Sequence, residues 1–187
     1  SMAAAGALSE LSAERVWAEL SKALAGDAPE RFIEVVRAVG ALEPWFLEFR
    51  DHDPVRPTKD LPGAGAFAAF VSQLDAEEIE ALSGRLKAPK SHRRLALWIV
   101  RYRAVWPDWR AADGRELMAA LGELQAFKPD SGLHEALGLA KTLGARGTDD
   151  LIEAVAKIGA EVRVEQLQAQ GLAGPEIGQA LADARLN

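Results

Sequence analysis

Cysteine is absent from this 187-residue chain, and threonine, tyrosine and long apolar runs are scarce. Without cysteine the protein can form neither a disulfide nor a thiolate metal site, which suits a reducing compartment such as the cytoplasm. No apolar run approaches the roughly 20 residues that a membrane-spanning helix needs. The first residues lack the basic segment and apolar block of a secretory signal. We therefore expect a cytoplasmic protein without a membrane partner.

Signals for β-strands are also missing, because no stretch alternates strictly between apolar and polar residues. Alanine, leucine, glutamate and arginine dominate, and apolar residues recur at helical spacing throughout. With 49% apolar and 27% charged residues, the chain can bury a core of ordinary size. The sequence predicts an all-α protein of about ten helices.

Capping residues mark where several helices should begin. Ser12 is expected to cap a first helix, Asp27 a second and Asp113 a later one, and Asp75 with Glu78 fits a capping box. The first helix should bury a face of Val16, Leu20 and Leu24. The second should bury a face of Phe32, Val35, Val36 and Val39. The later helices are predicted at 67–74, 76–86, 90–102, 114–127, 131–144, 148–170 and 176–185.

Residues 51–65 differ from the rest of the chain because proline, glycine and aspartate are concentrated there. This composition predicts a linker loop between two helical parts. The expected organisation is a helical segment at 1–50, the linker at 51–65, a helical domain at 66–145 and terminal helices at 146–187.

A search for chemistry finds no complete catalytic motif. His52, His92 and His134 lie too far apart to suggest a metal site, and we interpret His52 with Asp53 as a solvated turn. Gly63-Ala64-Gly65 is too short for a phosphate loop and indicates a hinge. The acidic residues at 77–80 are typical of a solvated helix face. We predict no catalytic residue, no metal site and no cofactor in this chain.

Positive charge is concentrated in one stretch, although the formal net charge of the chain is −6. Residues 85–110 contain a single acid, Asp108. Their basic side chains are Arg85, Lys87, Lys90, Arg93, Arg94, Arg101, Arg103 and Arg110. Such clustering in an acidic protein favours a phosphate-binding surface whose affinity falls with salt. The alternative is a basic helix that pairs with acidic neighbours at 75–80.

A second phosphate-binding candidate lies near the end of the sequence. Gly174 and Pro175 open the last predicted helix, and a helix start offers unpaired backbone N–H groups to an anion. The alternative is a capped terminal helix that packs through Ile177 and Leu181.

Four stretches resemble the bacterial class II tRNA nucleotidyltransferases, the CCA-adding enzymes. They are GALSELSAERVWAEL at 6–20, FIEVVRAVGAL at 32–42 followed by Trp45, Phe46 and Glu48, LKAP at 86–89, and GLAGPEIGQAL at 171–181. The resemblance implies an elongated neck, body and tail without the family's catalytic head and without its histidine-aspartate (HD) domain. In that family the head, with its short sheet, binds Mg²⁺ and CTP or ATP. The resemblance therefore implies these ligands only when a head is supplied in cis.

The resemblance also implies a partner and a set of contact residues. The partner would be tRNA, held at the backbone of its acceptor and T arms, in tRNA 3′ end processing. Glu14 and Arg15 match the neck motif that supports the nucleotide pocket. The implied RNA contacts are Arg85, Lys87, Lys90, Arg93, Arg94, Arg101, Arg103, Gly174 and Pro175.

Two other interpretations stay open from the sequence. The chain could be a protein-interaction scaffold that has lost RNA binding, with partly exposed aromatic anchors. The candidate anchors are Trp45, Phe46, Trp106 and Trp109. A residual transferase activity is the third interpretation, for which the sequence offers no site. The oligomeric state is open.

Overall fold

The computed structural model describes residues 10–61 and 63–161. Within these residues the chain forms eight α-helices and one 3-10 helix and no strand, so the predicted all-α class is confirmed. The chain divides into two compact units, Ser1–Arg101 and Tyr102–Asn187. Gly174, Pro175 and the predicted last helix lie outside the described residues.

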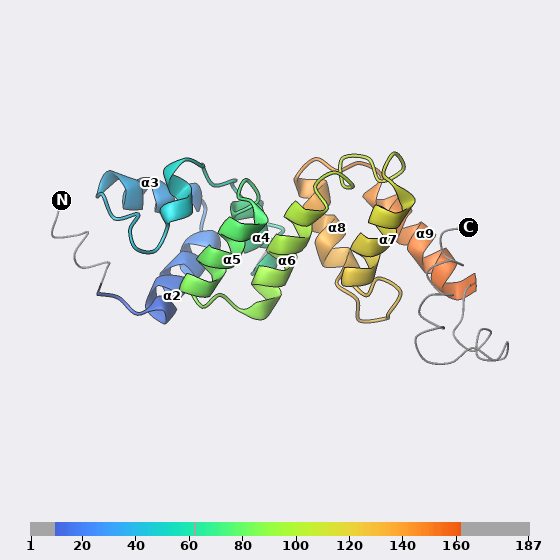
Figure 1. Cartoon of the computed structure of the whole chain (residues 1–187), viewed down its shortest axis with the longest axis horizontal. Helices are drawn as coiled ribbons and strands as arrows, with labels where there is room; N and C mark the ends of the chain where they lie inside the picture. The colour runs from blue at the N-terminus through green and yellow to red at the C-terminus, as the bar shows by residue number, and fades with distance from the viewer. Residues whose placement is uncertain (1–9, 62, 162–187) are drawn as a thin grey trace. The chain divides into compact units, whose positions relative to one another are not determined.

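The first unit is built around α6, which packs against α4 and α5, while α2 packs against α4 (Figure 1). Five consecutive residues of α6, Leu95 to Ile99, are buried, so the second half of this helix is enclosed by its neighbours. The elements of this unit are α2 (Ala13–Leu24), α3 (Glu30–Ala38), the 3-10 helix η1 (Leu47–Arg50), α4 (Ala64–Phe70), α5 (Ala76–Arg85) and α6 (Lys90–Arg101).

Helix α2 begins where the sequence predicts. The Ser12 side chain accepts a hydrogen bond from the backbone N–H of Arg15, which satisfies one of the unpaired donors at the helix start. Val16, Leu20 and Leu24 are buried, as their spacing predicts. This helix therefore presents its remaining faces to solvent and to the first turn of α6.

The predicted inner face of α3 was partly wrong. Val36 is buried, but so is Ile33, whereas Val35 is 60% exposed. Asp27 does not cap this helix; its carboxylate lies 2.7 Å from Lys59 Nζ instead. The physical reason is position, because the helix begins at Glu30 with Pro29 as its N-cap residue, and Asp27 lies two positions before that.

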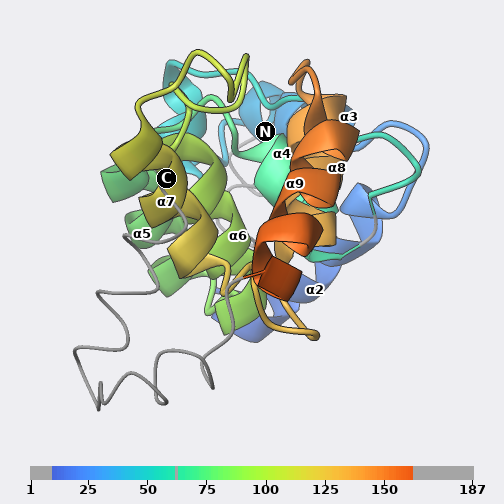
Figure 2. The ribbon, with the colours of Figure 1, turned by 90° about the vertical axis from the view of Figure 1, so that its right-hand side faces the viewer.

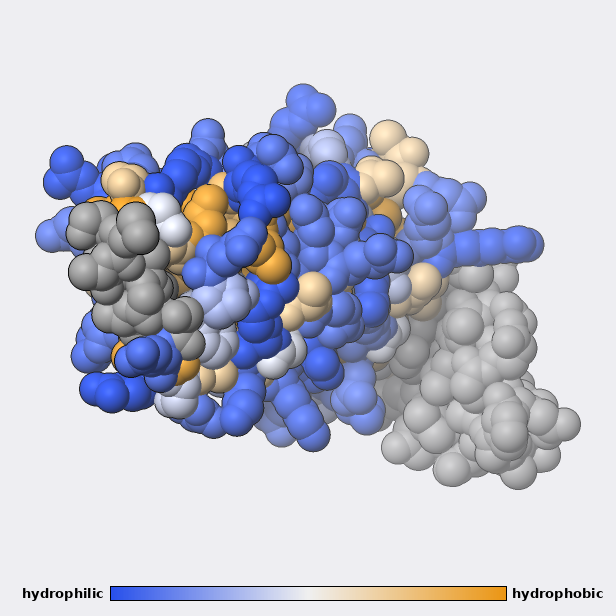
Figure 3. Space-filling view, turned by 60° about the vertical axis from the view of Figure 1, so that its left-hand side comes forward, coloured by the Kyte–Doolittle hydropathy of each residue, from blue (hydrophilic) through white to orange (hydrophobic). Residues whose placement is uncertain are grey.

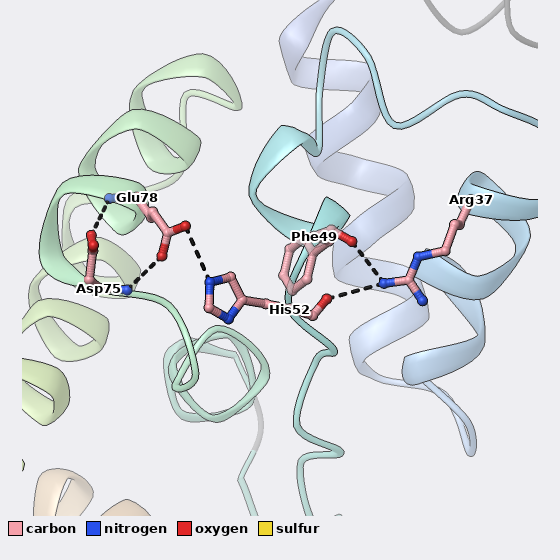
Figure 4. Close-up of polar contacts among 5 residues, drawn as sticks. All are labelled: Arg37, Phe49, His52, Asp75 and Glu78. Carbon is pink, nitrogen blue, oxygen red and sulfur yellow. Dashed lines mark hydrogen bonds and ion pairs between the residues drawn. The ribbon is translucent and has the colours of Figure 1, made fainter.

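The segment 51–65 lies inside the first unit and is anchored to the elements around it. On α3, Arg37 donates hydrogen bonds to the carbonyl oxygens of Phe49 and His52 (Figure 4). The His52 ring points the other way and places Nε2 3.5 Å from a Glu78 carboxylate oxygen at the start of α5. Val55 N–H also bonds to the Phe70 carbonyl. These contacts tie residues 51–55 to α3, to the end of α4 and to the start of α5.

The capping box at the start of α5 is confirmed (Figure 4). Asp75 accepts a hydrogen bond from the backbone N–H of Glu78, and Glu78 accepts one from the backbone N–H of Asp75. Two donors at the helix start are satisfied reciprocally, which fixes where α5 begins.

The second unit contains α7 (Gly114–Glu123), α8 (Leu133–Thr142) and α9 (Thr148–Glu161). Helices α8 and α9 pack against each other (Figure 2). Asp113 caps α7 as predicted, accepting from two backbone N–H groups. Before α7, Trp109 Nε1 donates a 2.8 Å hydrogen bond to the Gly147 carbonyl, which ties this loop to the start of α9.

Candidate nucleic-acid interface

The basic helix α6 exposes part of its charge on one side. Lys90, Arg94 and Arg101 are four and seven residues apart, a spacing that aligns them along a helix, and all are exposed. Lys90 and Arg94 take part in no ion pair within the described part of the chain. These two cations can therefore meet an outside anion without first breaking an internal contact.

Arg85 is placed very differently. Its guanidinium group donates to both carboxylate oxygens of Glu48, at 2.6 and 2.9 Å, and to the backbone carbonyl of Trp45 at 2.9 Å. The Glu48 side chain is only 7% exposed and that of Arg85 23%. A planar, bidentate pair in this setting fixes η1 to the end of α5. Arg85 is thus a structural residue.

Lys87 and Arg93 are also paired, but at the surface. Lys87 Nζ lies 2.6 Å from Glu14 of α2, and Arg93 lies 3.4 Å from Glu80 of α5. The hydrogen bond and charge of Lys87 hold the pKa of the Glu14 carboxyl below its ordinary value. Exposed pairs of this kind contribute little to stability, so a phosphate can compete for either cation.

The remaining predicted contact residues fall in separate places. Arg101 and Arg103 are both exposed, but Arg101 ends the first unit and Arg103 belongs to the second. Arg110 stacks over the Trp109 ring at 4.6 Å and pairs with Asp150, which anchors the loop before α7. Arg15 is exposed on α2 beside Glu14. The structure therefore brings together only the part of the basic cluster that lies on α6 and its N-terminal side.

The two interpretations of the basic stretch each describe part of it. As the alternative interpretation expected, a carboxylate of the 75–80 segment pairs with α6, because Glu80 contacts Arg93. The carboxylates that pair with Arg85 and Lys87 are Glu48 and Glu14, which lie farther away in sequence. Lys90 and Arg94 stay accessible. The surface that can serve a polyanion is therefore smaller than the charge count suggests.

An aromatic cluster joins α2 to the start of α6. Trp17 makes edge contacts with Phe67 and with the His92 ring, each at 5.2 Å between centroids. This cluster fixes the first turn of α6, and with it Lys90 and Arg94, against α2.

The sequence analysis missed two cations in the segment 51–65. Arg56 lies 3.5 Å from Glu30, and Lys59 pairs with Asp27. Together with Ser21 and His92 they line a pocket of about 470 Å³. The sequence shows these two charges within a proline-rich segment, but it does not show that they lie opposite Asp27 and Glu30.

The predicted aromatic anchors were partly wrong. Phe46 and Trp106 are buried and cannot be surface anchors, since each fills the core of its own unit. A different apolar surface is exposed between α2 and α3, amid a mostly hydrophilic face (Figure 3). Its lining residues include Leu11, Val16, Ala23, Phe32, Val35 and Val36.

Metal-binding clusters and membrane-spanning helices are two other features that the described residues could contain. Among residues 10–61 and 63–161, no group of three or more histidine, aspartate or glutamate side chains is arranged to hold a metal ion. No helix in this described part is long and apolar enough to cross a membrane.

Comparison with known proteins begins at the N-terminal helices. A family model described as "probable RNA and SrmB-binding site of polymerase A" matches residues 2–52. The matched segment contains α2, α3 and η1. No solved structure is significantly similar to the chain.

Curated relatives match over the full length of the chain. It is 27% identical over 205 residues to the CCA-adding enzyme of Pseudomonas entomophila, which covers 100% of this chain and 55% of the relative. The CCA-adding enzyme of Coxiella burnetii is 25% identical, with 99% and 51% covered. The multifunctional CCA protein of Pseudomonas putida is 28% identical, with 99% and 54% covered. The chain is thus similar along its length to CCA-adding enzymes, and it spans about half the length of the curated relatives that it matches.

Proposed function

We propose that this chain is a tRNA-binding helical module that contacts the backbone of the acceptor and T arms and is not catalytic alone. The relatives are CCA-adding enzymes, and the family that matches residues 2–52 is described as RNA-binding. The structural observation that carries the proposal is the exposed pair Lys90 and Arg94, which no carboxylate neutralises in the described part of the chain.

The chemistry of backbone recognition fits this pair. Ammonium and guanidinium groups neutralise phosphates and release counterions, so each contact adds to the salt dependence of binding. Arg93 can join them, because its pair with Glu80 is about half exposed on both sides and therefore weak. Arg85 cannot, because leaving Glu48 would strand a buried carboxylate.

The test is a filter-binding titration of tRNA and of a generic RNA duplex at several salt concentrations. Replacing Lys90 and Arg94 with alanine should weaken tRNA binding about tenfold and reduce the salt slope by about 1.8, the contribution of roughly two phosphate contacts. The matched control is Arg115→Ala with Lys157→Ala, which removes the same charge from exposed positions on α7 and α9 in the second unit. The control should bind like the unaltered chain.

Binding of tRNA no tighter than of the duplex would contradict the tRNA proposal. Equal losses in the α6 variant and its control would show that net charge alone, rather than the α6 surface, sets the affinity.

The proposal extends to nucleotide addition only if a head domain is present in cis. Mg²⁺ and CTP or ATP would act with a head domain supplied in cis, and Glu14 and Arg15 would then support the nucleotide pocket. The described residues hold no carboxylate cluster for Mg²⁺, so no step of the reaction is assigned to them.

A protein-interaction scaffold is the second candidate function. The apolar surface between α2 and α3 favours it, since Val35 in its lining is 60% exposed. The matching family description names SrmB beside RNA, so a protein of that kind is the partner to test. Absence of binding between the purified chain and an SrmB-type protein would remove this candidate.

A further inference from the structure

A pocket of about 470 Å³ lies in the first unit between the end of α2 and residues 56–61, with Gly63 also in its lining. Pockets for small organic ligands commonly measure about 300–1,000 Å³, so a nucleoside fits this volume. The lining side chains used below are Ser21, Leu24, Asp27, Arg56, Lys59 and His92.

The charges around this pocket nearly balance. Lys59 Nζ lies 2.7 Å from an Asp27 carboxylate oxygen, and Arg56 pairs with Glu30 and donates to the backbone carbonyl of Asp27. The C-terminal end of α2 adds partial negative charge on the Asp27 side. A bare phosphate gains little in such a place, because Asp27 and Glu30 repel it about as much as Arg56 and Lys59 attract it. A neutral ligand with both donors and acceptors gains from both sides.

The other walls suit a flat ring. Leu24 and Pro57 are buried and offer apolar contact, while Ser21 and Thr58 add hydroxyl groups that can donate or accept. The His92 ring forms another wall and is held by an edge contact with Trp17 and a tilted contact with Phe67. A rigid ring can contact a heterocycle without losing much conformational freedom.

We propose that this pocket binds a single nucleobase, supplied either by an unstacked nucleotide of RNA or by a free nucleoside. The proposal goes beyond tRNA backbone binding and stands without it, because the pocket does not use Lys90 or Arg94. Carbonyl groups of the base would accept hydrogen bonds from Arg56, and its amino groups would donate to the Asp27 carboxylate.

The test is an NMR titration of the ¹⁵N-labelled chain with each common ribonucleoside and with short single-stranded tetraribonucleotides. Chemical shifts should move at residues 24–27, at 56–61 and at His92, with dissociation constants near the millimolar range. Ser21→Phe fills the pocket and should weaken binding about tenfold or more. Ala18→Phe places the same side chain one turn earlier on α2, at an exposed position outside the pocket, and should leave binding unchanged.

Thr58→Phe is a second filling variant in the exposed segment, and it serves if Ser21→Phe fails to fold. Tighter binding of the tetranucleotides than of nucleosides identifies RNA as the source of the base, and the reverse identifies a free nucleoside. No localised shift with any probe up to about 10 mM, or unchanged binding by both filling variants, overturns the proposal. If the unaltered chain bound nucleosides but did not bind tRNA, this result would count against the proposed function alone.

Discussion

Residues of one chemical type have separate roles in the basic stretch of this protein. Arg85 and Arg94 are both arginines within ten positions of each other, yet one is enclosed with Glu48 and the other is exposed. Sequence located the positive charge correctly. It could not assign the roles, because the carboxylates that decide them lie 37 residues away for Arg85 and 73 for Lys87.

The enclosed pair allows a prediction about stability. Arg85→Ala should lower the free energy of unfolding by about 3 kcal/mol, because Glu48 is left as a mostly buried charge without its partner. Arg85→Lys should recover only part of this, since an ammonium group cannot reproduce the bidentate contact. Urea denaturation followed by circular dichroism measures both.

The control for this prediction replaces both partners. Arg85→Met with Glu48→Leu removes the charges together and should be less destabilising than Arg85→Ala. If the double variant were the less stable of the two, the enclosed carboxylate would not be the cause of the loss.

At the scale of elements, the sequence predicts where several helices begin more accurately than which helix faces are buried. The caps at Ser12, Asp75 and Asp113 are contacts between residues two or three positions apart, so local sequence contains all the information. The face of α3 is different. Its apolar residues form two overlapping stripes, and packing against the rest of the unit selects Ile33 with Val36 over Val35.

The corrected face of α3 is testable by a pair of substitutions. Ile33→Ala should cost about 2–4 kcal/mol, because a fully buried side chain leaves a cavity. Val35→Ala on the same helix should change stability by no more than about 0.5 kcal/mol, since this side chain is mostly exposed. Equal effects in thermal unfolding would show that the exposed assignment of Val35 is wrong.

At the scale of the whole molecule, the chain consists of two compact units that meet in sequence at Arg101 and Tyr102. Composition indicates a boundary at 51–65 instead. Prolines and glycines can be read from the sequence, whereas the set of residues that pack into one core cannot. The division at 101 falls inside the basic stretch, where composition does not change. Only the contacts of α6 with α4 and α5 reveal which unit it belongs to.

Because each unit has its own core, we expect each to have its own free energy of unfolding. Leu82→Ala in the first unit and Leu137→Ala in the second each open a cavity in a buried site. We expect native-state hydrogen exchange to accelerate mainly in the unit that carries the substitution, because each core closes within its own unit. Uniform acceleration across both units by either variant would show that they unfold as one.

The enclosure of α6 limits how an RNA could approach it. Since Leu95 to Ile99 are all buried, the first turn, with Lys90, Arg93 and Arg94, is the broadest reachable part of the helix. A duplex would contact this turn and would not lie along the whole length of α6. The expected footprint is accordingly short, covering a few consecutive phosphates of one strand.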